Sequence, residues 1–220
     1  MNEPHLISDK MRAHYETVWQ AGDAWDFETS EFEQARYEHQ LKFLSGRRYE
    51  RALEIGCGSG CFTRRLASIA EYVVALDIAE AAIERARAQA AGAGPGKVEF
   101  RVADAMQYDL HAEGPWDLVV LSETMYCLGW LYPFFDIAFF ARQLFNATRT
   151  GGRLLLTNTY GEAEKDWLLQ PWIIDTYRDL FRNVGYRLEN QEVFRGNKAG
   201  VDFSVLLTLF HKAETTGAGP

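Results

Sequence analysis

Three glycines stand at alternate positions in the run 54–60 (EIGCGSG), namely Gly56, Gly58 and Gly60. Glycine has no Cβ atom, so such a run permits a tight turn and lets the backbone approach a ligand closely. The dinucleotide-binding fingerprint GxGxxG separates its second and third glycines by more residues than this run does. The spacing therefore argues against a bound pyrophosphate.

Acidic residues accompany this glycine run. Asp77 ends a β-rich segment, where a carboxylate can accept hydrogen bonds from both hydroxyls of a ribose. Asp104, followed by Ala105, is placed to receive the exocyclic amine of an adenine, and Glu54 could engage an amino-acid group through water or backbone. Together they favour a ligand with a ribose, an adenine and an ammonium group but no phosphate. The alternative is structural, because such acids often cap helices or flank turns, and Asp77 directly precedes a predicted helix.

Strands and helices must position these residues, and hydrophobic periodicity predicts them in regular alternation. Strands are expected at 52–55, 72–77, 97–102, 116–121, 152–158, 186–195 and 202–211, and helices at 9–20, 31–45, 62–67, 79–91, 131–148 and 171–183. The alternation predicts an α/β fold with a doubly wound, Rossmann-like sheet of seven mostly parallel strands, a C-terminal antiparallel strand and an N-terminal helical extension. Ligands of such sheets bind beyond the carboxyl ends of the strands, where the glycine run and the acids lie.

Composition sets the domain organisation. The chain has 220 residues, of which 47% are hydrophobic and 25% charged, as in one soluble domain with appendages. We expect a helical lid or extension at 1–46, the main domain at 47–213 and a disordered tail at 214–220. The lid would fold over the bound cofactor.

Charge and apolar runs exclude several classes of partner. A net charge of −8 disfavours binding to nucleic acid through a broad basic surface. No apolar stretch fits a signal peptide or a membrane span, so we expect a cytoplasmic protein that does not contact membranes. Histidines lack metal-ligand partners at suitable spacing, so no metal is expected. The three cysteines are expected to be reduced.

The sequence resembles the class I S-adenosylmethionine-dependent methyltransferases, in which EIGCGSG is the first motif. Within them it is most similar to the NodS-type nodulation N-methyltransferases, which methylate the free amine of a deacetylated chitooligosaccharide. The likeness covers about 24–210 and includes Ala24-Trp25, the Phe32–Arg36 motif, LEIGCGSGCFTRRLA, WDLVVLSETMYCL and paired glycines at 151–152. The chain departs from the family at Asp26, where the family has arginine, at Thr150, where it has proline, and over 158–172, which matches weakly.

The resemblance implies S-adenosylmethionine as cofactor and S-adenosylhomocysteine as product. It nominates a set of cofactor-binding residues: Trp25, Glu54, Gly56, Cys57, Gly58, Gly60, Asp77, Ile78, Asp104, Ala105 and Ser122. Trp25 would help to close the cofactor site, although it could equally be a hydrophobic staple for the next helix. Glu123 and Tyr126 would face the methyl group as catalytic residues.

Methyl transfer from a sulfonium is an in-line displacement, so the acceptor must be held opposite the leaving sulfur with water excluded. An amine acceptor must be neutral, and Glu123 could take its proton or steer it. Tyr126 could orient the acceptor through its hydroxyl group. The structural alternatives are that Glu123 binds only the loop backbone or an arginine, and that Tyr126 packs in the core.

Three functions remain open from the sequence. The first is an N-methyltransferase for a small amine, with amino sugars among the candidates. The second is an O-methyltransferase for a phenolic or carboxylic metabolite, whose pocket would include the aromatic segment 130–140. The third is a non-catalytic regulatory protein that binds the cofactor. Tyr160, Trp167 and Trp172 are further pocket candidates, with core packing as the alternative. The sequence leaves the oligomeric state open.

Overall fold

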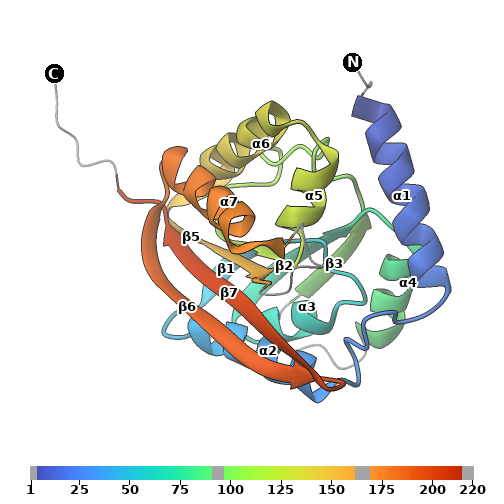
Figure 1. The fold of residues 1–220 in the computed structure, drawn as a ribbon. Helices are drawn as coiled ribbons and strands as arrows, with labels where there is room; N and C mark the ends of the chain where they lie inside the picture. Colours follow the sequence, from blue (N-terminus) through green and yellow to red (C-terminus); the bar gives the residue numbers. More distant parts are fainter. Residues whose placement is uncertain (1–3, 91–96, 162–168, 215–220) are drawn as a thin grey trace, which may run out of the picture.

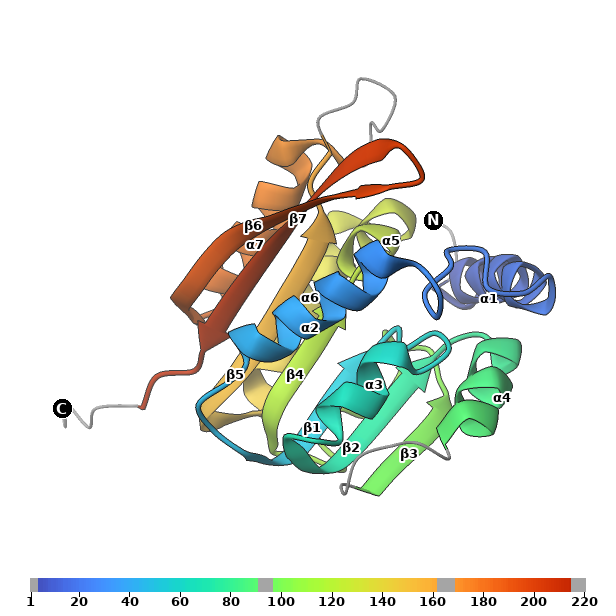
Figure 2. The same cartoon turned by 90° about the horizontal axis from the view of Figure 1, so that it is seen from below.

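The computed structural model of the chain describes residues 4–90, 97–161 and 169–214. One seven-stranded sheet runs through the molecule in the order β3-β2-β1-β4-β5-β7-β6 (Figures 1 and 2). Its strands are β1 Tyr49–Ile55, β2 Ala70–Asp77, β3 Lys97–Val102, β4 Trp116–Ser122, β5 Thr148–Thr159, β6 Arg187–Lys198 and β7 Val201–His211. All neighbouring pairs are parallel except β5–β7 and β6–β7. The predicted doubly wound sheet and its antiparallel C-terminal pair are confirmed.

Seven helices accompany the sheet in the described part of the chain: α1 Pro4–Gln20, α2 Glu31–Phe43, α3 Cys61–Leu66, α4 Glu80–Gln89, α5 Met125–Leu131, α6 Phe134–Ala147 and α7 Pro171–Asn183. Figure 2 shows α2 and α3 across one face of the sheet and α6 and α7 across the other. α1 lies beside α4 in both ribbon views. None of the described helices is long and apolar enough to cross a lipid bilayer.

Alternating side chains of the central strands enter two different cores. Val119 and Leu121 pack in the core that α5, α6 and α7 cover, whereas Leu118 and Val120 pack in the core that α2 and α3 cover. Successive side chains of a strand point to opposite faces, so a strand covered on both faces must be apolar almost throughout. This explains why the sequence around WDLVVLS has no polar alternation.

The order of the strands reverses between β1 and β4. From β1 the chain adds β2 and β3 on one side, and from β4 it adds β5 on the other. The carboxyl ends of β1 and β4 therefore diverge into loops that leave in opposite directions, which opens a crevice between them. The glycine run follows β1 and Glu123 follows β4, so the topology brings both to this crevice.

The predicted helix 131–148 corresponds to α6, which begins three residues later than predicted, whereas α5, separated from α6 by Tyr132 and Pro133, was not predicted. Tyr132 adopts an extended conformation (φ −100°, ψ 147°), and Pro133 is the N-cap residue of α6. A proline disfavours the helical conformation of the residue before it, which accounts for the break. α1 also begins at Pro4, earlier than the predicted start at residue 9. Most of the predicted tail 214–220 lies outside the described residues.

Phe181 tests the contribution of the core beneath α7. Its side chain is fully buried against the rings of Tyr186 and Phe210, with centroids 6.2 and 6.3 Å away. We expect Phe181→Ala to lower the free energy of unfolding by about 3–5 kcal/mol, measured by urea denaturation. The matched control is Phe135→Ala, because Phe135 is 78% exposed and should change stability by less than about 0.5 kcal/mol. Equal losses in both variants would contradict this assignment of the core.

Candidate active site

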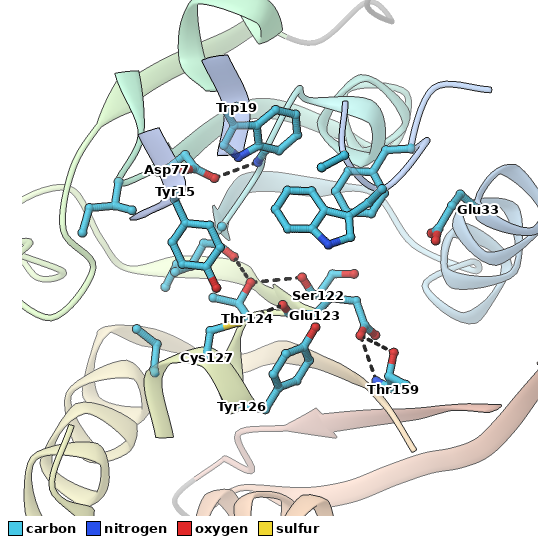
Figure 3. Close-up of a pocket in the computed structure, with 18 of the residues that line it drawn as sticks. Tyr15, Trp19, Glu33, Asp77, Ser122, Glu123, Thr124, Tyr126, Cys127 and Thr159 are labelled. Carbon is cyan, nitrogen blue, oxygen red and sulfur yellow. Dashed lines mark hydrogen bonds between the residues drawn. The ribbon is translucent and has the colours of Figure 1, made fainter. Parts of the chain in front are cut away.

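A cavity of about 560 Å³ lies at the carboxyl ends of β1, β2 and β4, a size typical of small-molecule sites. Figure 3 shows its labelled side chains converging from α1, α2, α5 and the strand ends. The residues that line it include Tyr15, Trp19, Trp25, Phe27, Phe32, Glu33, Arg36, Gly56, Gly58, Asp77, Ile78, Ala105, Ser122, Glu123, Thr124, Tyr126, Cys127, Thr159, Lys198, Phe203 and Val205. Most of this wall is aromatic or aliphatic, and its charged groups fall at two ends.

The glycine run forms the tight turn that its spacing predicts. Gly56 has φ +76°, and a Cβ there would lie 2.3 Å from the Oγ1 atom of Thr124. Gly58 has φ +52°, and a Cβ there would lie 2.8 Å from the ring of Trp19. Both positions need glycine, because the conformation is unfavourable for other residues and the space is already occupied. The glycines thus let β4 and α1 close onto the turn.

Asp77 holds the glycine turn and does not cap α4, whose N-cap residue is Ala79. Its Oδ2 atom accepts a hydrogen bond from the Gly58 amide at 2.9 Å, and its Oδ1 atom accepts one from the Ala79 amide at 3.0 Å. The carboxylate also lines the cavity. Burial raises the pKa of Asp77, while these backbone donors act in the opposite direction. Asp77 therefore organises the turn, and its role in binding a ribose stays a prediction.

Nine of the thirteen predicted site residues line the cavity: Trp25, Gly56, Gly58, Asp77, Ile78, Ala105, Ser122, Glu123 and Tyr126. The other four predicted residues do not line the cavity: Glu54, Cys57, Gly60 and Asp104. Gly60 is the N-cap residue of α3, and the thiol of Cys57 is buried. Their predicted part in binding stays a prediction.

Glu54 and Asp104 are held by donors within the chain. Thr63 donates its hydroxyl hydrogen to Oε2 of Glu54 at 2.6 Å, and burial raises the pKa of Glu54 to about 8. Asp104 accepts hydrogen bonds from the Met106 amide and the Gln107 side chain, both at 2.9 Å. Its neighbours Ala103 and Ala105 line the cavity, whereas Asp104 does not. The direction in which each carboxylate points therefore depends on its local donors.

Glu123 is held with one carboxylate oxygen bound and the other free. Oε2 accepts hydrogen bonds from the amide of Thr159 at 2.9 Å and from its hydroxyl group at 2.7 Å. Oε1 is buried and has no hydrogen-bond partner among the described residues. Burial raises the pKa of Glu123. Its backbone has φ +55°, an unfavourable conformation for a glutamate that the surrounding contacts must maintain. A buried acceptor without a partner is the strongest sign of a ligand contact in the site.

Tyr126 follows on the first turn of α5 and lines the same part of the cavity. Its burial raises the pKa of the phenol well above the ordinary value, so the hydroxyl stays protonated and can donate a hydrogen bond. Tyr126 and Glu123 both lie at the β4–α5 junction, as the resemblance implies.

Aromatic rings from the N-terminal segment cover the cavity. The rings of Trp25 and Phe27 stack with centroids 5.4 Å apart, and Trp19 lies 5.4 Å from Trp25. The N-cap residue of α2 is Ser30, so Trp25 lies too far before the helix to be its hydrophobic staple. That alternative is wrong.

Four charged residues outside the predicted set also line the cavity: Asp26, Glu33, Arg36 and Lys198. Arg36 donates to Oε2 of Glu33 through Nε at 2.8 Å and Nη2 at 2.6 Å, and Lys198 Nζ lies 2.8 Å from Oε1 of Glu33. The family resemblance includes Glu33 and Arg36 in the Phe32–Arg36 motif but assigns neither of them a role. Charged residues three positions apart on the buried face of a helix were the available signal. Nothing in the sequence around Lys198 identifies it.

The aromatic segment 130–140 does not form the pocket. The Phe134, Phe135 and Phe139 side chains are more than half exposed, and none of them lines this cavity. Trp172 is also exposed, whereas Tyr160 is partly buried outside the cavity wall. The exposed rings neither pack in the core nor line the cavity, so both predictions for them are wrong. Trp167 lies outside the described residues.

The comparisons with known proteins agree with this geometry. A family model described as nodulation protein S (NodS) matches residues 8–134. Nodulation protein S of Rhizobium tropici is 31% identical over 156 residues, covering 69% of this chain and 59% of that protein. The Sinorhizobium fredii protein is 30% identical over 129 residues, covering 58% and 54%. The chain thus spans between half and three-fifths of the length of these relatives.

Solved structures share the fold. The N-methyltransferase NodS from Bradyrhizobium japonicum, in complex with S-adenosyl-L-homocysteine, aligns with a TM-score of 0.73 at 22% identity, covering 93% of this chain and 99% of that one. A methyltransferase from Leishmania major that depends on S-adenosylmethionine aligns with a TM-score of 0.71 at 18% identity, covering 92% and 82%. At such identities the likeness establishes the shared fold.

The raised pKa of Glu54 predicts a pH-dependent stability. Between its ordinary value of 4.5 and about 8, the folded state keeps a proton that the unfolded state has lost, so stability must fall as pH rises. Glu54→Gln removes this term. We expect the difference in free energy of unfolding, Glu54→Gln minus wild type, to increase by up to about 5 kcal/mol as the pH rises from 4.5 to 8. Urea denaturation at each pH measures it.

The control for this measurement is Glu84→Gln, which removes an exposed carboxylate from α4. If both variants changed equally with pH, the effect would come from net charge and not from burial of Glu54.

Proposed function

The chain belongs to the nodulation protein S (NodS) family, and from this premise we propose that it is a methyltransferase that transfers the methyl group of S-adenosylmethionine to a small amine, releasing S-adenosylhomocysteine. The observation that carries the proposal is the unpartnered Oε1 of Glu123, buried in a cavity whose other end is the glycine turn and Asp77. The S-adenosylhomocysteine complex of the B. japonicum protein supports the cofactor.

The residues present fit this cofactor. Gly56 and Gly58 line the cavity, so the backbone of the glycine turn can lie against a ligand, and Asp77 supplies an acceptor for ribose hydroxyls. The cations of the described cavity wall, Arg36 and Lys198, are both paired with Glu33 and are not placed to bind a phosphate at the turn. A nucleoside without phosphate satisfies this arrangement. We assign Ile78 and Ala105 to the adenine and Trp25 to the cover.

When bound, S-adenosylmethionine supplies an electrophilic methyl group on a positively charged sulfur. The residues of this chain would position the acceptor and receive its proton. A neutral amine nitrogen forms its bond to the methyl carbon as the carbon–sulfur bond breaks, and the amine proton passes to Oε1 of Glu123. Tyr126 donates a hydrogen bond that orients the acceptor. The rings of Trp25 and Phe27 exclude water from the reacting atoms.

The amine is favoured over the other two functions by particular residues. The phenolic alternative depended on the aromatic segment 130–140, and its exposed rings do not line the cavity. A purely regulatory protein would gain nothing from a buried carboxylate oxygen without a partner, because such a group destabilises the fold by about 1–3 kcal/mol or more. The net charge of −8 supports a small-molecule acceptor over nucleic acid, and we propose a cytoplasmic location.

Binding of S-adenosylhomocysteine tests the cofactor. Calorimetry should detect binding by the wild-type protein, and Asp77→Ala should weaken it about 10–100-fold, because charge-assisted hydrogen bonds contribute about 1.5–3 kcal/mol each. Asp9→Ala, on the exposed side of α1, is the matched control and should bind like wild type. Absence of binding by the wild-type protein, or undiminished binding by Asp77→Ala, would overturn the cofactor assignment.

Turnover tests the acceptor and the base. A panel of amines, including glucosamine and chitosan oligomers, and a panel of phenols would be incubated with S-adenosylmethionine carrying a labelled methyl group. We expect methylated nitrogen only. Glu123→Gln should lower kcat by about 10²–10⁴-fold while the affinity for S-adenosylhomocysteine stays within about threefold of wild type. The control is Glu84→Gln. Methylation of phenols alone would reject the amine, and unchanged turnover of Glu123→Gln would reject it as the base.

A further inference from the structure

Four charged side chains line the acceptor end of the cavity, and three of them, Glu33, Arg36 and Lys198, are joined by ion pairs. Glu33 and Arg36 come from α2, Glu123 from the β4–α5 junction, and Lys198 from the end of β6. Two are acidic and two are basic, so the cluster is neutral as a whole. Such a group is stable in a buried place only when its members are paired and hydrogen-bonded.

Arg36 is the centre of this cluster and is fully buried. Its Nε and Nη2 atoms donate to Oε2 of Glu33, and Nη1 donates to the hydroxyl group of Ser122 at 3.1 Å. Its guanidinium also lies over the ring of Tyr37, 4.6 Å from the centroid. None of these hydrogen bonds goes to Glu123. The positive charge is nevertheless close enough to oppose the rise in the pKa of Glu123 that burial causes.

Glu33 is the reason that Arg36 does not pair with Glu123. One oxygen of Glu33 binds the guanidinium and the other binds Lys198, whose ammonium group also contacts the carbonyl oxygen of Trp25. Glu33 is therefore held from two sides and keeps the guanidinium turned toward itself. Glu123 then has a cation nearby that does not occupy its free oxygen.

The groups that face Glu123 come from three described elements. Arg36 and Glu33 lie on α2, Thr159 ends β5, and Tyr126 and Cys127 lie on α5. Burial raises the pKa of Tyr126 and of Cys127, so both are neutral near pH 7. Glu33 opposes the ionisation of Glu123. Arg36 is therefore the cation of this set, and its charge adds to the two hydrogen bonds from Thr159 in favouring the ionised form of Glu123.

We propose that Arg36 is a positioning residue for methyl transfer: tied to Glu33 and Ser122, it keeps Glu123 ionised while leaving Oε1 free to accept a hydrogen from the acceptor amine. This inference rests on the proposed function. A buried carboxyl group without a nearby cation would hold its own proton and could not take one from an amine. An arginine bound directly to Glu123 would occupy the oxygen that the amine needs.

Titration of Glu123 tests the inference without an acceptor. Glutamate labelled with ¹³C at Cδ would be incorporated, and the Glu123 signal would be assigned from the spectrum of Glu123→Gln. In Arg36→Met the pKa of Glu123 should rise by about 1–3 units, because an attractive charge is lost. In Arg36→Lys, which keeps the charge, the rise should be smaller than half of that. A pKa of Glu123 that does not change in folded Arg36→Met would overturn the proposal.

The pH profile of kcat supplies the functional readout. Activity is lost as pH falls through the pKa of Glu123, so the acidic limb in Arg36→Met should move upward by the same number of units, with activity restored at higher pH. A merely structural role would lower activity at every pH without moving the limb, and that result would contradict the proposal. Arg36→Met should also bind S-adenosylhomocysteine within about threefold of wild type.

Glu33→Gln provides a second variant in case Arg36→Met does not fold. Loss of this acid frees Arg36 to pair with Glu123. The pKa of Glu123 should therefore fall, in the direction opposite to its change in Arg36→Met. The turnover number kcat should decrease, because Arg36 would occupy Oε1. A rise in the pKa of Glu123 would overturn the inference. If wild-type protein showed the expected titration but methylated no amine, the proposed function would fail while the electrostatic arrangement stood.

Discussion

The structure depends on the closure between the ends of β1 and β4, where the order of the strands reverses. The hydroxyl group of Thr124 donates to the carbonyl oxygen of Ile55 at 2.9 Å, and it occupies the space that a Cβ on Gly56 would need. This contact holds the glycine turn against the residue that follows Glu123. The glycine turn and Glu123 therefore lie side by side and line one cavity.

A polar seam beneath α2 determines the charges of that cavity. The side chain of Gln40 donates to the hydroxyl groups of Ser122 and Thr157 at 3.2 and 3.3 Å. Arg36, one helical turn earlier in α2, also donates to the hydroxyl group of Ser122. Buried polar groups fix an arrangement more strictly than apolar ones, because a shift would leave donors unpaired. The seam therefore fixes the rotation of α2 on the sheet and turns Glu33 toward the cavity.

Local patterns predicted the sheet, the glycine turn and Asp77, because strand periodicity and backbone freedom belong to neighbouring residues. They failed where partners are distant in sequence. Glu54 is bound by Thr63 and does not line the cavity. Lys198 contacts Glu33 because β6 packs beside α2, which no local pattern indicates. The predicted start of α6 at residue 131 was too early because apolar spacing continues through Tyr132 and Pro133, although the proline indicates where the helix begins.

Glu54 and Glu123 show how one residue type takes two roles at neighbouring strand ends. Both are buried, and burial raises the pKa of each. The influences that favour the charged form of Glu54 are one hydrogen bond from Thr63 and the charge of Arg64, and its pKa still reaches about 8, so it is mainly protonated at neutral pH. Glu123 has Arg36 beside it and two donors from Thr159. In the proposed mechanism, the nearby guanidinium of Arg36 and the two Thr159 donors make Glu123 available as a base, whereas the weaker set of donors around Glu54 leaves that carboxyl group protonated.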